Sequence, residues 1–203
     1  MRKATSILIL MLALCGVAYT QVRFAREFSA DFVSESGGHE TTGRYYASQG
    51  RTRNEIVHNG VVTSVMILDS QNHTAWELRP QHKLAVDMSA VVGNVQASAS
   101  QNLLTGSPPD PSNPCAPLRE YTCRKLDNED VNGRHTQKWE MKDTKNGNVM
   151  TVWIDPSLPW AIKTQSSSFT AEFRNLKEGP QPESLFQVPS DYRKSAFPSA
   201  ETR

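Results

Sequence analysis

The sequence predicts a mainly β protein of the α+β class, built as an unclosed antiparallel β-barrel or strongly curved sheet of about ten or eleven strands. Short runs in which apolar and polar residues alternate recur along most of the chain, and this alternation is typical of half-buried strands. Turn-forming pairs separate the runs, including Asn-Gly at 59–60, 132–133 and 146–147. Asn-Gly between two such runs is the strongest short signal of a hairpin, because both residues tolerate positive φ.

The first half of the chain predicts a meander of six short strands. In the first of them Phe28, Ala30 and Phe32 share one parity against polar neighbours, and Gly37-Gly38 ends the run. The six runs are "FSADF", "TTGRYYAS", "RTRNEIVH", "VVTSVMILD", the run that contains Trp76 and Leu78, and the run that contains Leu84, Val86 and Met88.

An insert of a different kind lies at 89–117. Its apolar residues recur near helical spacing, which predicts a short helix over Val91–Leu103 that includes Val95 and covers the concave face of the sheet. The alternative is a long flexible loop. The following "TGSPPDPSNPCAPL" holds five prolines among fourteen residues, so it is expected to be an extended loop.

The second half predicts five more strands, "REYTCRKLDNEDV", "HTQKWEMKD", "VMTVWID", "WAIKTQ" and "SSFTAEFRNL". Pro156 and Pro159 separate the third from the fourth, since proline ends a strand ladder. "VMTVWID" is apolar at both parities, with Val152 on one face and Trp153 on the other. A sheet that is apolar on both faces must be covered on both, or must wrap around something.

Residues 1–20 have the features of a secretory signal peptide: a basic start, the apolar run "ILILMLALCGVA" and then polar residues. Cleavage is expected after Ala18 or Thr20. An uncleaved anchor and lipidation at Cys15 are alternatives, although Leu14 stands where a lipidation site has a small residue. We therefore expect a periplasmic or secreted protein, with a single domain over 21–203 and no transmembrane segment in the mature chain.

Cleavage would leave Cys115 and Cys123, eight positions apart, as the remaining cysteines. In an oxidising compartment such a pair is expected to form a disulfide rather than a metal site or a nucleophile. The bridge would tether the Pro-rich loop to the strand that begins near Glu120.

Composition and motifs argue against several functions. With 22 basic and 21 acidic residues the net charge is +1, and no basic cluster with interleaved aromatics predicts nucleic-acid binding. No hydrolase, nucleotide-binding or zinc motif occurs, and the five histidines share no ligand spacing. Glu129-Asp130 and His135 flank a turn, which favours a solvated loop over an acid–base pair. We expect no enzymatic activity, no cofactor and no metal, and a monomer.

Aromatic and aliphatic residues supply the candidate binding site. By strand parity, one set of them lines the concave face of a wrapped sheet, together with Val91 and Val95 of the predicted helix. An ordinary hydrophobic core is the alternative for each of them. The candidate ligand-binding residues are Trp76, Leu78, Val86, Met88, Val91, Val95, Trp139, Val152, Ile154, Trp160, Phe169 and Phe173.

Several segments resemble the superfamily of lipoprotein-localisation (LolA-like) proteins, especially its uncharacterised periplasmic branch. A tyrosine-bearing strand leads into an Arg-x-Arg strand in "GRYYASQGRTRNEI", and "VMILDSQNHTAWELRPQHKLAVDM" follows. A "W-[IV]-D-P … P" hairpin and a final "L-F-x-x-P-x-x-Y" are further shared features. They correspond here to Trp153, Ile154, Asp155, Pro156 and Pro159, and to Leu185, Phe186, Pro189 and Tyr192.

The resemblance covers most of the mature chain and implies an unclosed barrel whose concave face is covered by helices and holds acyl chains. The sequence departs from the better-known carriers in having one helical insert and a Pro-rich loop with two cysteines. The expected function is binding of a lipid-like or other apolar ligand, such as lipoprotein acyl chains, in the periplasm. The alternative is a non-enzymatic interaction or regulatory module that binds another envelope protein through the same fold.

Overall fold

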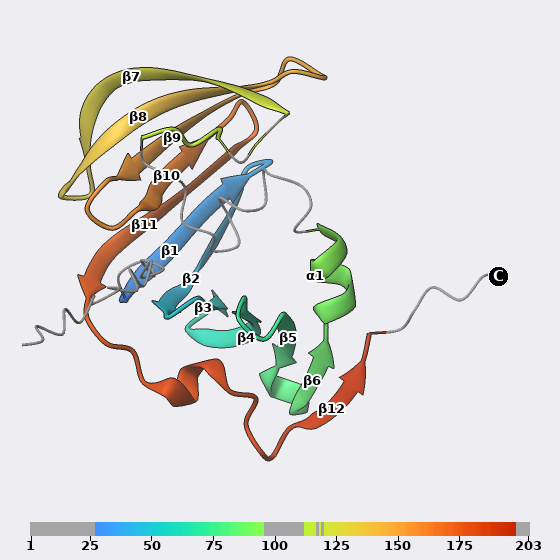
Figure 1. Cartoon of the computed structure of the whole chain (residues 1–203). Coiled ribbons are helices and arrows are strands. Elements are labelled where there is room, and N and C mark those ends of the chain that lie inside the picture. The colour runs from blue at the N-terminus through green and yellow to red at the C-terminus, as the bar shows by residue number, and fades with distance from the viewer. Residues whose placement is uncertain (1–26, 96–111, 117, 119, 198–203) are drawn as a thin grey trace, which may run out of the picture.

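The fold is a single strongly curved β-sheet (Figure 1). The computed structural model describes residues 27–95, 112–116, 118 and 120–197. Within them the sheet has twelve strands in the order β12-β6-β5-β4-β3-β2-β1-β11-β10-β9-β8-β7. β7 and β12 are its two edges, so the sheet does not close into a barrel. The predicted unclosed, strongly curved sheet is confirmed.

The strands are β1 (Phe28–Ser36), β2 (His39–Ser48), β3 (Arg51–His58), β4 (Val61–Asp69), β5 (Thr74–Arg79), β6 (Leu84–Asp87), β7 (Tyr121–Val131), β8 (Arg134–Asp143), β9 (Val149–Asp155), β10 (Trp160–Gln165), β11 (Phe169–Glu178) and β12 (Arg193–Ala196). The predicted six strands before the insert and five after it are all present. The twelfth strand, β12, comes from the C-terminal segment and pairs parallel with β6. A short 3₁₀ helix, η1 (Pro80–His82), joins β5 to β6, and a second, η2 (Glu183–Phe186), precedes β12.

Turn chemistry explains why the hairpins form where the sequence predicts them. Asn59-Gly60 has φ of 51° and 76°, and Asn132-Gly133 has φ of 50° and 76°. Two consecutive positive φ angles are what a type I′ turn requires. Only Gly147 of the third Asn-Gly pair has a positive φ, of 75°, and its N–H donates to the Asp143 carbonyl at 3.0 Å. That connection is therefore a longer turn.

The described helix, α1 (Ser89–Val95), directly follows β6. Asp87 Oδ1 accepts hydrogen bonds from Ser89 N at 2.9 Å and Ser89 Oγ at 2.6 Å. Ser89 Oγ in turn accepts from Ala75 N of β5 at 3.0 Å, which ties the start of the helix to the sheet. The rest of the predicted helix, with Ala99 and Leu103, lies outside the described residues.

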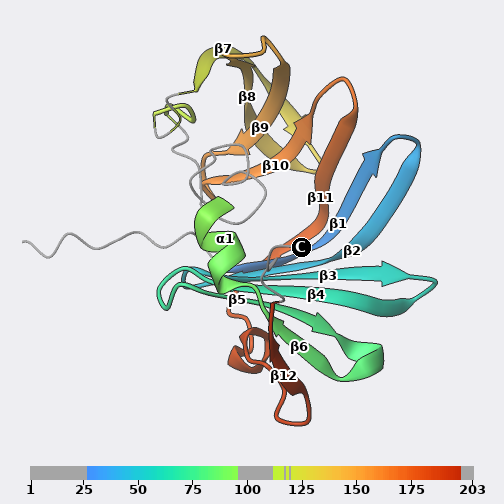
Figure 2. The same ribbon diagram turned by 90° about the vertical axis from the view of Figure 1, so that its right-hand side faces the viewer.

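The ladder registers divide the side chains into two faces, because residues paired across neighbouring strands point to the same side. The concave face carries Phe32, paired with Gly43 and Phe173, and it is the side on which α1 lies (Figure 2). The convex face is covered by η2 and the segment that leads to β12 (Figures 1 and 2).

Gly43 is needed where β2 and β3 approach closely at the bend. A Cβ atom at this position would lie 1.9 Å from the Glu55 carbonyl oxygen. Any side chain would force β3 aside, so the sequence "TTGRYY" requires its glycine here.

Candidate functional site

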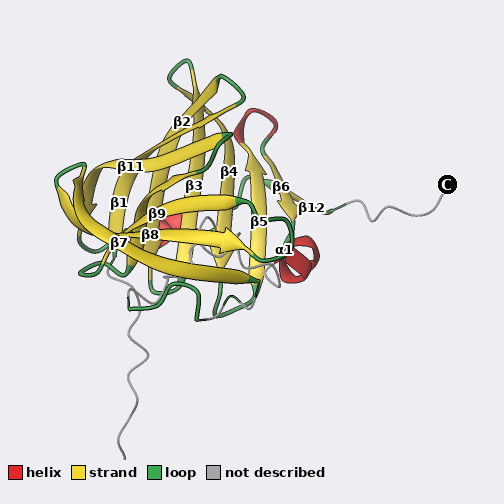
Figure 3. Ribbon diagram, turned by 90° about the horizontal axis from the view of Figure 1, so that it is seen from above, coloured by secondary structure: helices red, strands yellow, loops and turns green. Residues whose placement is uncertain are grey.

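Five rings from β1, β2, β10 and β11 form an aromatic cluster. Figure 3 shows the curved sheet that carries them from above, with β1, β2 and β11 labelled. The Tyr45 and Phe173 ring centres lie 4.9 Å apart, and Phe28 meets Trp160 edge to face at 5.2 Å. Phe32 lies against Phe173 at 6.0 Å. Offset and edge-to-face contacts at such distances stabilise more than buried area alone. This cluster packs β10 against β1, β2 and β11.

Beside the cluster lies an apolar pocket of about 170 Å³. Phe32, Tyr45 and Phe173 form one part of its wall, and Phe169 and Ala171 of β11 extend it. Asn54, Ala161, Thr164 and Glu172 complete the lining. An apolar pocket with a few convergent polar groups is the usual form of a small-molecule site. This concave-face pocket is the candidate functional site.

Two buried polar atoms of the pocket lining have no hydrogen-bond partner among the described residues, Tyr45 Oη and Asn54 Oδ1. Tyr45 is only 3% exposed. Burial raises the pKa of Tyr45 far above its ordinary value, and the neighbouring Thr52 hydroxyl opposes this rise only in part. Tyr45 therefore stays a neutral phenol. A buried polar atom without a partner costs about 1–3 kcal/mol, so each of these atoms is a point where a ligand gains affinity.

Two further unpaired buried atoms are Gln137 Oε1 and Trp139 Nε1 of β8. Gln137 pairs with Ile154 and Trp139 pairs with Val152, which places both on the concave face. The four orphan polar atoms of the described residues thus all point to the concave side of the sheet.

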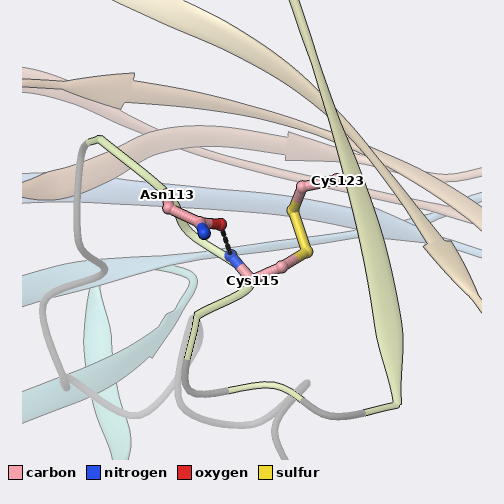
Figure 4. The surroundings of a disulfide bond; sticks show 3 residues. All are labelled: Asn113, Cys115 and Cys123. Carbon is pink, nitrogen blue, oxygen red and sulfur yellow. Dashed lines mark hydrogen bonds between the residues drawn. A yellow bond between two sulfur atoms is a disulfide. The ribbon is translucent and has the colours of Figure 1, made fainter.

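Trp139 belongs to a second apolar cluster, at the β7 end of the concave face, with Leu118, Met141, Val152, Ile154 and Ala161. Cys115 and Cys123 pack against it and form a disulfide, which confirms the predicted pairing (Figure 4). The Cys115 N–H donates to Asn113 Oδ1 at 3.2 Å. The bridge holds the described end of the Pro-rich loop, with buried Leu118, against the sheet.

The structure brings together six of the sequence-predicted site residues. Trp139, Val152 and Ile154 lie in the second cluster, and Trp160, Phe169 and Phe173 lie in or beside the aromatic cluster and pocket. Their role in ligand binding stays a prediction.

Trp76 and Leu78 lie on the opposite face, so the expectation that they share a face with Val86 is wrong. Trp76 pairs with Asp87 and Leu78 with Ala85, whereas Val86 pairs with Glu77. Trp76 and Leu78 pack against the C-terminal segment on the convex side. The η1 connection sets this register, and a shift of one residue exchanges the faces of a strand.

The remaining predicted residues lie around α1. Val86 is buried on the concave side of β6. Met88 joins β6 to α1, and its N–H donates to the Ala75 carbonyl at 2.8 Å. Val91 is a half-buried residue of α1, and Val95 is its last residue. None of the four is among the residues that line the pocket.

Sequence reasoning missed Tyr45, Asn54 and Thr164 as pocket residues. Tyr45 and Tyr46 are adjacent, so alternation alone leaves open which of them faces inward. Asn54 is a polar residue on a concave-face position, a place where a strand pattern predicts an apolar one. A sequence reader could have found these residues only by noting a tyrosine pair on one strand opposite a polar residue on the next.

The acidic groups near the β7–β8 turn have structural partners. Glu129 Oε2 accepts from Trp153 Nε1 at 3.0 Å and from Lys138 Nζ at 2.8 Å. The Lys138 hydrogen bond and then the Trp153 hydrogen bond lower the pKa of Glu129 below its ordinary value. His135 Nδ1 lies 2.8 Å from Asp130 Oδ1, and both side chains are exposed. These contacts brace the turn.

A larger cleft, of about 780 Å³, lies between the β2–β3 turn, the β4–β5 turn and the segment after β11. Its walls are mostly charged and amide side chains, among them Glu27, Arg51, Asp69 and Gln71. Arg51 Nη1 lies 3.5 Å from Glu183 Oε1 across it. Such walls do not suit an apolar chain.

Among solved structures, MucB has the same fold. The crystal structure of MucB has 15% identity and a TM-score of 0.56, and the match covers 83% of this chain and 59% of MucB. The complex structure of Pseudomonas aeruginosa MucA/MucB gives 14% identity and a TM-score of 0.53 over 83% of this chain and 57% of that chain. This chain thus spans less than two thirds of the MucB chains it matches. At such identity the likeness shows the fold alone.

A LolA superfamily protein, NE2245 from Nitrosomonas europaea, also matches, with 9% identity over 82% of this chain and 91% of that chain. Its TM-score is 0.35. No protein-family model matches the chain, and no curated protein does. In the part of the chain that the structure describes, no helix has the length and apolar character needed to cross a membrane.

Proposed function

We propose that this protein is a non-enzymatic binding protein that holds an apolar chain of a lipid-like ligand in the concave-face pocket. The observation that carries the proposal is an apolar pocket of about 170 Å³ with two unpaired buried polar atoms in its wall. Empty apolar space in a protein interior forfeits packing energy, and unpaired polar atoms add to that cost. A ligand that fills the pocket and meets these atoms removes both penalties.

The pocket volume limits what it encloses. An apolar cavity of roughly 150 Å³ accommodates a molecule of the size of benzene. The pocket therefore takes one end of an acyl chain, and the rest of the chain would lie along the concave face toward the second apolar cluster. Burial gains about 0.8 kcal/mol for each methylene, so affinity is expected to rise about fourfold with each carbon added while concave-face surface remains.

Tryptophan emission provides the test, because Trp160 lies in the aromatic cluster that borders the pocket. Ligands with alkyl chains of increasing length should shift or quench the emission, with dissociation constants that fall along the series. A series in which none binds below about 1 mM, equivalent to roughly −4 kcal/mol, refutes the proposal.

The variant Ala171→Leu tests whether the ligand binds in this pocket. Ala171 is buried in the pocket wall, so a leucine there should fill the space and weaken binding at least tenfold. Thr170→Leu on the same strand is the matched control, because Thr170 pairs with Glu35 and Gln165 on the convex face. Equal weakening by both variants would show that the ligand lies elsewhere.

A protein partner is the second candidate, and the MucB structures favour it, since one of them is a complex with MucA(peri). One apolar side chain of a partner would fill a pocket of about 170 Å³ as well as the end of an acyl chain does. Failure of the alkyl series would leave this candidate in place.

We also propose that the protein acts after export. Removal of residues 1–18 or 1–20 as a signal peptide would place the Cys115–Cys123 disulfide in an oxidising compartment. The intact mass of protein purified from the cell envelope should correspond to a chain that begins at Tyr19 or Gln21. A mass with residues 1–18 retained, or with an acylated Cys15, would contradict export in this form.

A further inference from the structure

The pocket lining presents polar groups as well as apolar surface. Tyr45 on β2 and Asn54 on β3 are direct register partners, and both line the pocket. Cβ atoms of such partners lie about 4.5–5.5 Å apart. Nevertheless, among the described residues, neither Tyr45 Oη nor Asn54 Oδ1 has a hydrogen-bond partner in good geometry. The Thr52 hydroxyl acts on Tyr45 as a donor that lowers its pKa, which leaves the Tyr45 proton itself unused. One side chain offers a free donor and its neighbour a free acceptor.

We infer that the ligand carries a neutral amide at the end of its apolar chain that enters the pocket, an inference that rests on the proposed function. An amide carbonyl accepts from the Tyr45 hydroxyl, and an amide N–H donates to Asn54 Oδ1. Both orphan atoms are then satisfied by a single group. Because the buried Tyr45 stays a neutral phenol, it keeps the proton that this contact needs.

The charge of the pocket lining argues against a ligand whose anionic head group enters the pocket. None of the nine described residues that line the pocket is basic. The charged group among them, Glu172, is paired with Arg174. A carboxylate or phosphate would lose its hydration without gaining a counter-ion, which is costly in a buried site. A fatty-acid carboxylate is therefore a poor ligand for this wall of the pocket.

Three probes with the same chain separate these chemistries: octanamide, methyl octanoate and octanoate at pH 7.5. Octanamide presents a donor and an acceptor, methyl octanoate an acceptor alone, and octanoate an anion. Octanamide should bind about tenfold more tightly than methyl octanoate, equivalent to about 1.4 kcal/mol, and methyl octanoate more tightly than octanoate. Tryptophan emission and isothermal titration calorimetry are suitable readouts.

Tyr45→Phe tests the donor. The variant should bind octanamide about tenfold more weakly than the natural protein, yet be about as stable to urea, because the removed hydroxyl has no hydrogen bond of good geometry among the described residues. Tyr46→Phe is the matched control: Tyr46 pairs with Ser29 and Arg53 on the convex face, and octanamide affinity should not change.

The outcomes are distinguishable. Octanoate or methyl octanoate binding as tightly as octanamide would overturn the inference and leave the proposed function standing. Unchanged octanamide affinity in Tyr45→Phe, or a marked loss of its stability, would also overturn the inference, since the hydroxyl would then not be free for the ligand. Binding of none of the three probes, nor of longer chains, would refute the proposed function as well.

Discussion

Asp155 shows how one residue fixes the turn between β9 and β10. Its carboxylate is buried and accepts from Ser157 N and Ser157 Oγ, both at 2.7 Å, and from Arg134 Nε at 2.5 Å. Arg134 also reaches Glu178 Oε1 at 2.8 Å, so β8, the turn and the end of β11 are linked through one guanidinium. This is the physical reason for an aspartate in the segment "WIDP".

The pKa of Asp155 reflects these contacts. Burial alone would raise it, but hydrogen bonds from Ser157 and Arg134 outweigh burial and hold the pKa below its ordinary value. A carboxyl with a depressed folded pKa contributes stability that is fully present above the unfolded value of about 3.9 and is lost as the pH falls through the folded value.

Asp155→Asn should lower the free energy of unfolding by about 2 kcal/mol at pH 7, because a charged hydrogen bond in a buried site is lost. The difference from the natural protein should shrink below about pH 4, where the carboxyl of the unfolded chain and, at lower pH, that of the folded protein becomes protonated. Urea unfolding at several pH values measures both effects.

Asp130→Asn is the control for Asp155→Asn. Asp130 is 77% exposed and faces His135, so its replacement should change stability by less than about 0.5 kcal/mol. Equal effects of the two variants, or a difference that does not depend on pH, would show that the Asp155 network does not stabilise the fold.

At the scale of elements, the C-terminal segment is the cover of the convex face. Phe186 of η2 is 8% exposed and packs with Val65, Ile67, Leu78 and Ala85. The Arg51 guanidinium lies 5.0 Å from the centre of its ring. Arg53 Nη1 donates to the Leu185 carbonyl at 3.0 Å, which fixes the approach of the segment to β3. The final "L-F-x-x-P-x-x-Y" therefore builds a convex core, with Tyr192 at its border.

Phe186→Ala should lower the free energy of unfolding by about 3 kcal/mol, since it removes a buried aromatic side chain and leaves a cavity. Phe197→Ala is the control of identical chemistry, because Phe197 is 44% exposed and should tolerate the change with an effect below about 0.5 kcal/mol. Urea unfolding at neutral pH compares them. A Phe186→Ala protein as stable as the Phe197→Ala protein would mean that the segment does not cover the sheet.

Local patterns predicted most elements, for reasons that are themselves local. Alternation and Asn-Gly turns act over a few residues, and the hairpins at Asn59-Gly60 and Asn132-Gly133 form as expected. The face of Trp76 could not be predicted, because it depends on a left-handed residue, Lys83 with φ of 45°, at the end of η1. Nor could β12, whose pairing with β6 joins residues more than a hundred positions apart.

The candidate site was predictable only in part. The site residues of β8, β9 and β11 could be predicted from strand alternation, because each of the strands β8 to β11 is joined to the next by a hairpin with a clear turn. The Tyr45–Asn54 pair depends instead on which of two adjacent tyrosines faces inward, and on a register shift in β1 between Ser29 and Asp31 that brings Phe173 opposite Phe32. Such shifts have no reliable signature in a single sequence.

At the scale of the whole molecule, the open sheet must protect two edges from pairing with other copies. β7 is an edge strand of eleven residues, a length that invites edge-to-edge association. It carries exposed charges, among them Lys125 and Asp127, and its register shifts between Lys125 and Asn128. The other edge, β12, has only four residues. Charges, an irregular register and short length are the devices by which natural sheets avoid such pairing.

We therefore expect a monomer, with the sedimentation-equilibrium mass of one chain over a roughly hundredfold range of concentration. Lys125→Val combined with Asp127→Val should introduce concentration-dependent dimers, because it leaves a flatter, apolar edge. The control removes one basic and one acidic exposed residue from strands inside the sheet, Lys142→Val with Glu40→Val, and should stay monomeric. Dimers of the natural protein at low concentration, or dimers of both variants alike, would show that the charges of β7 do not guard this edge.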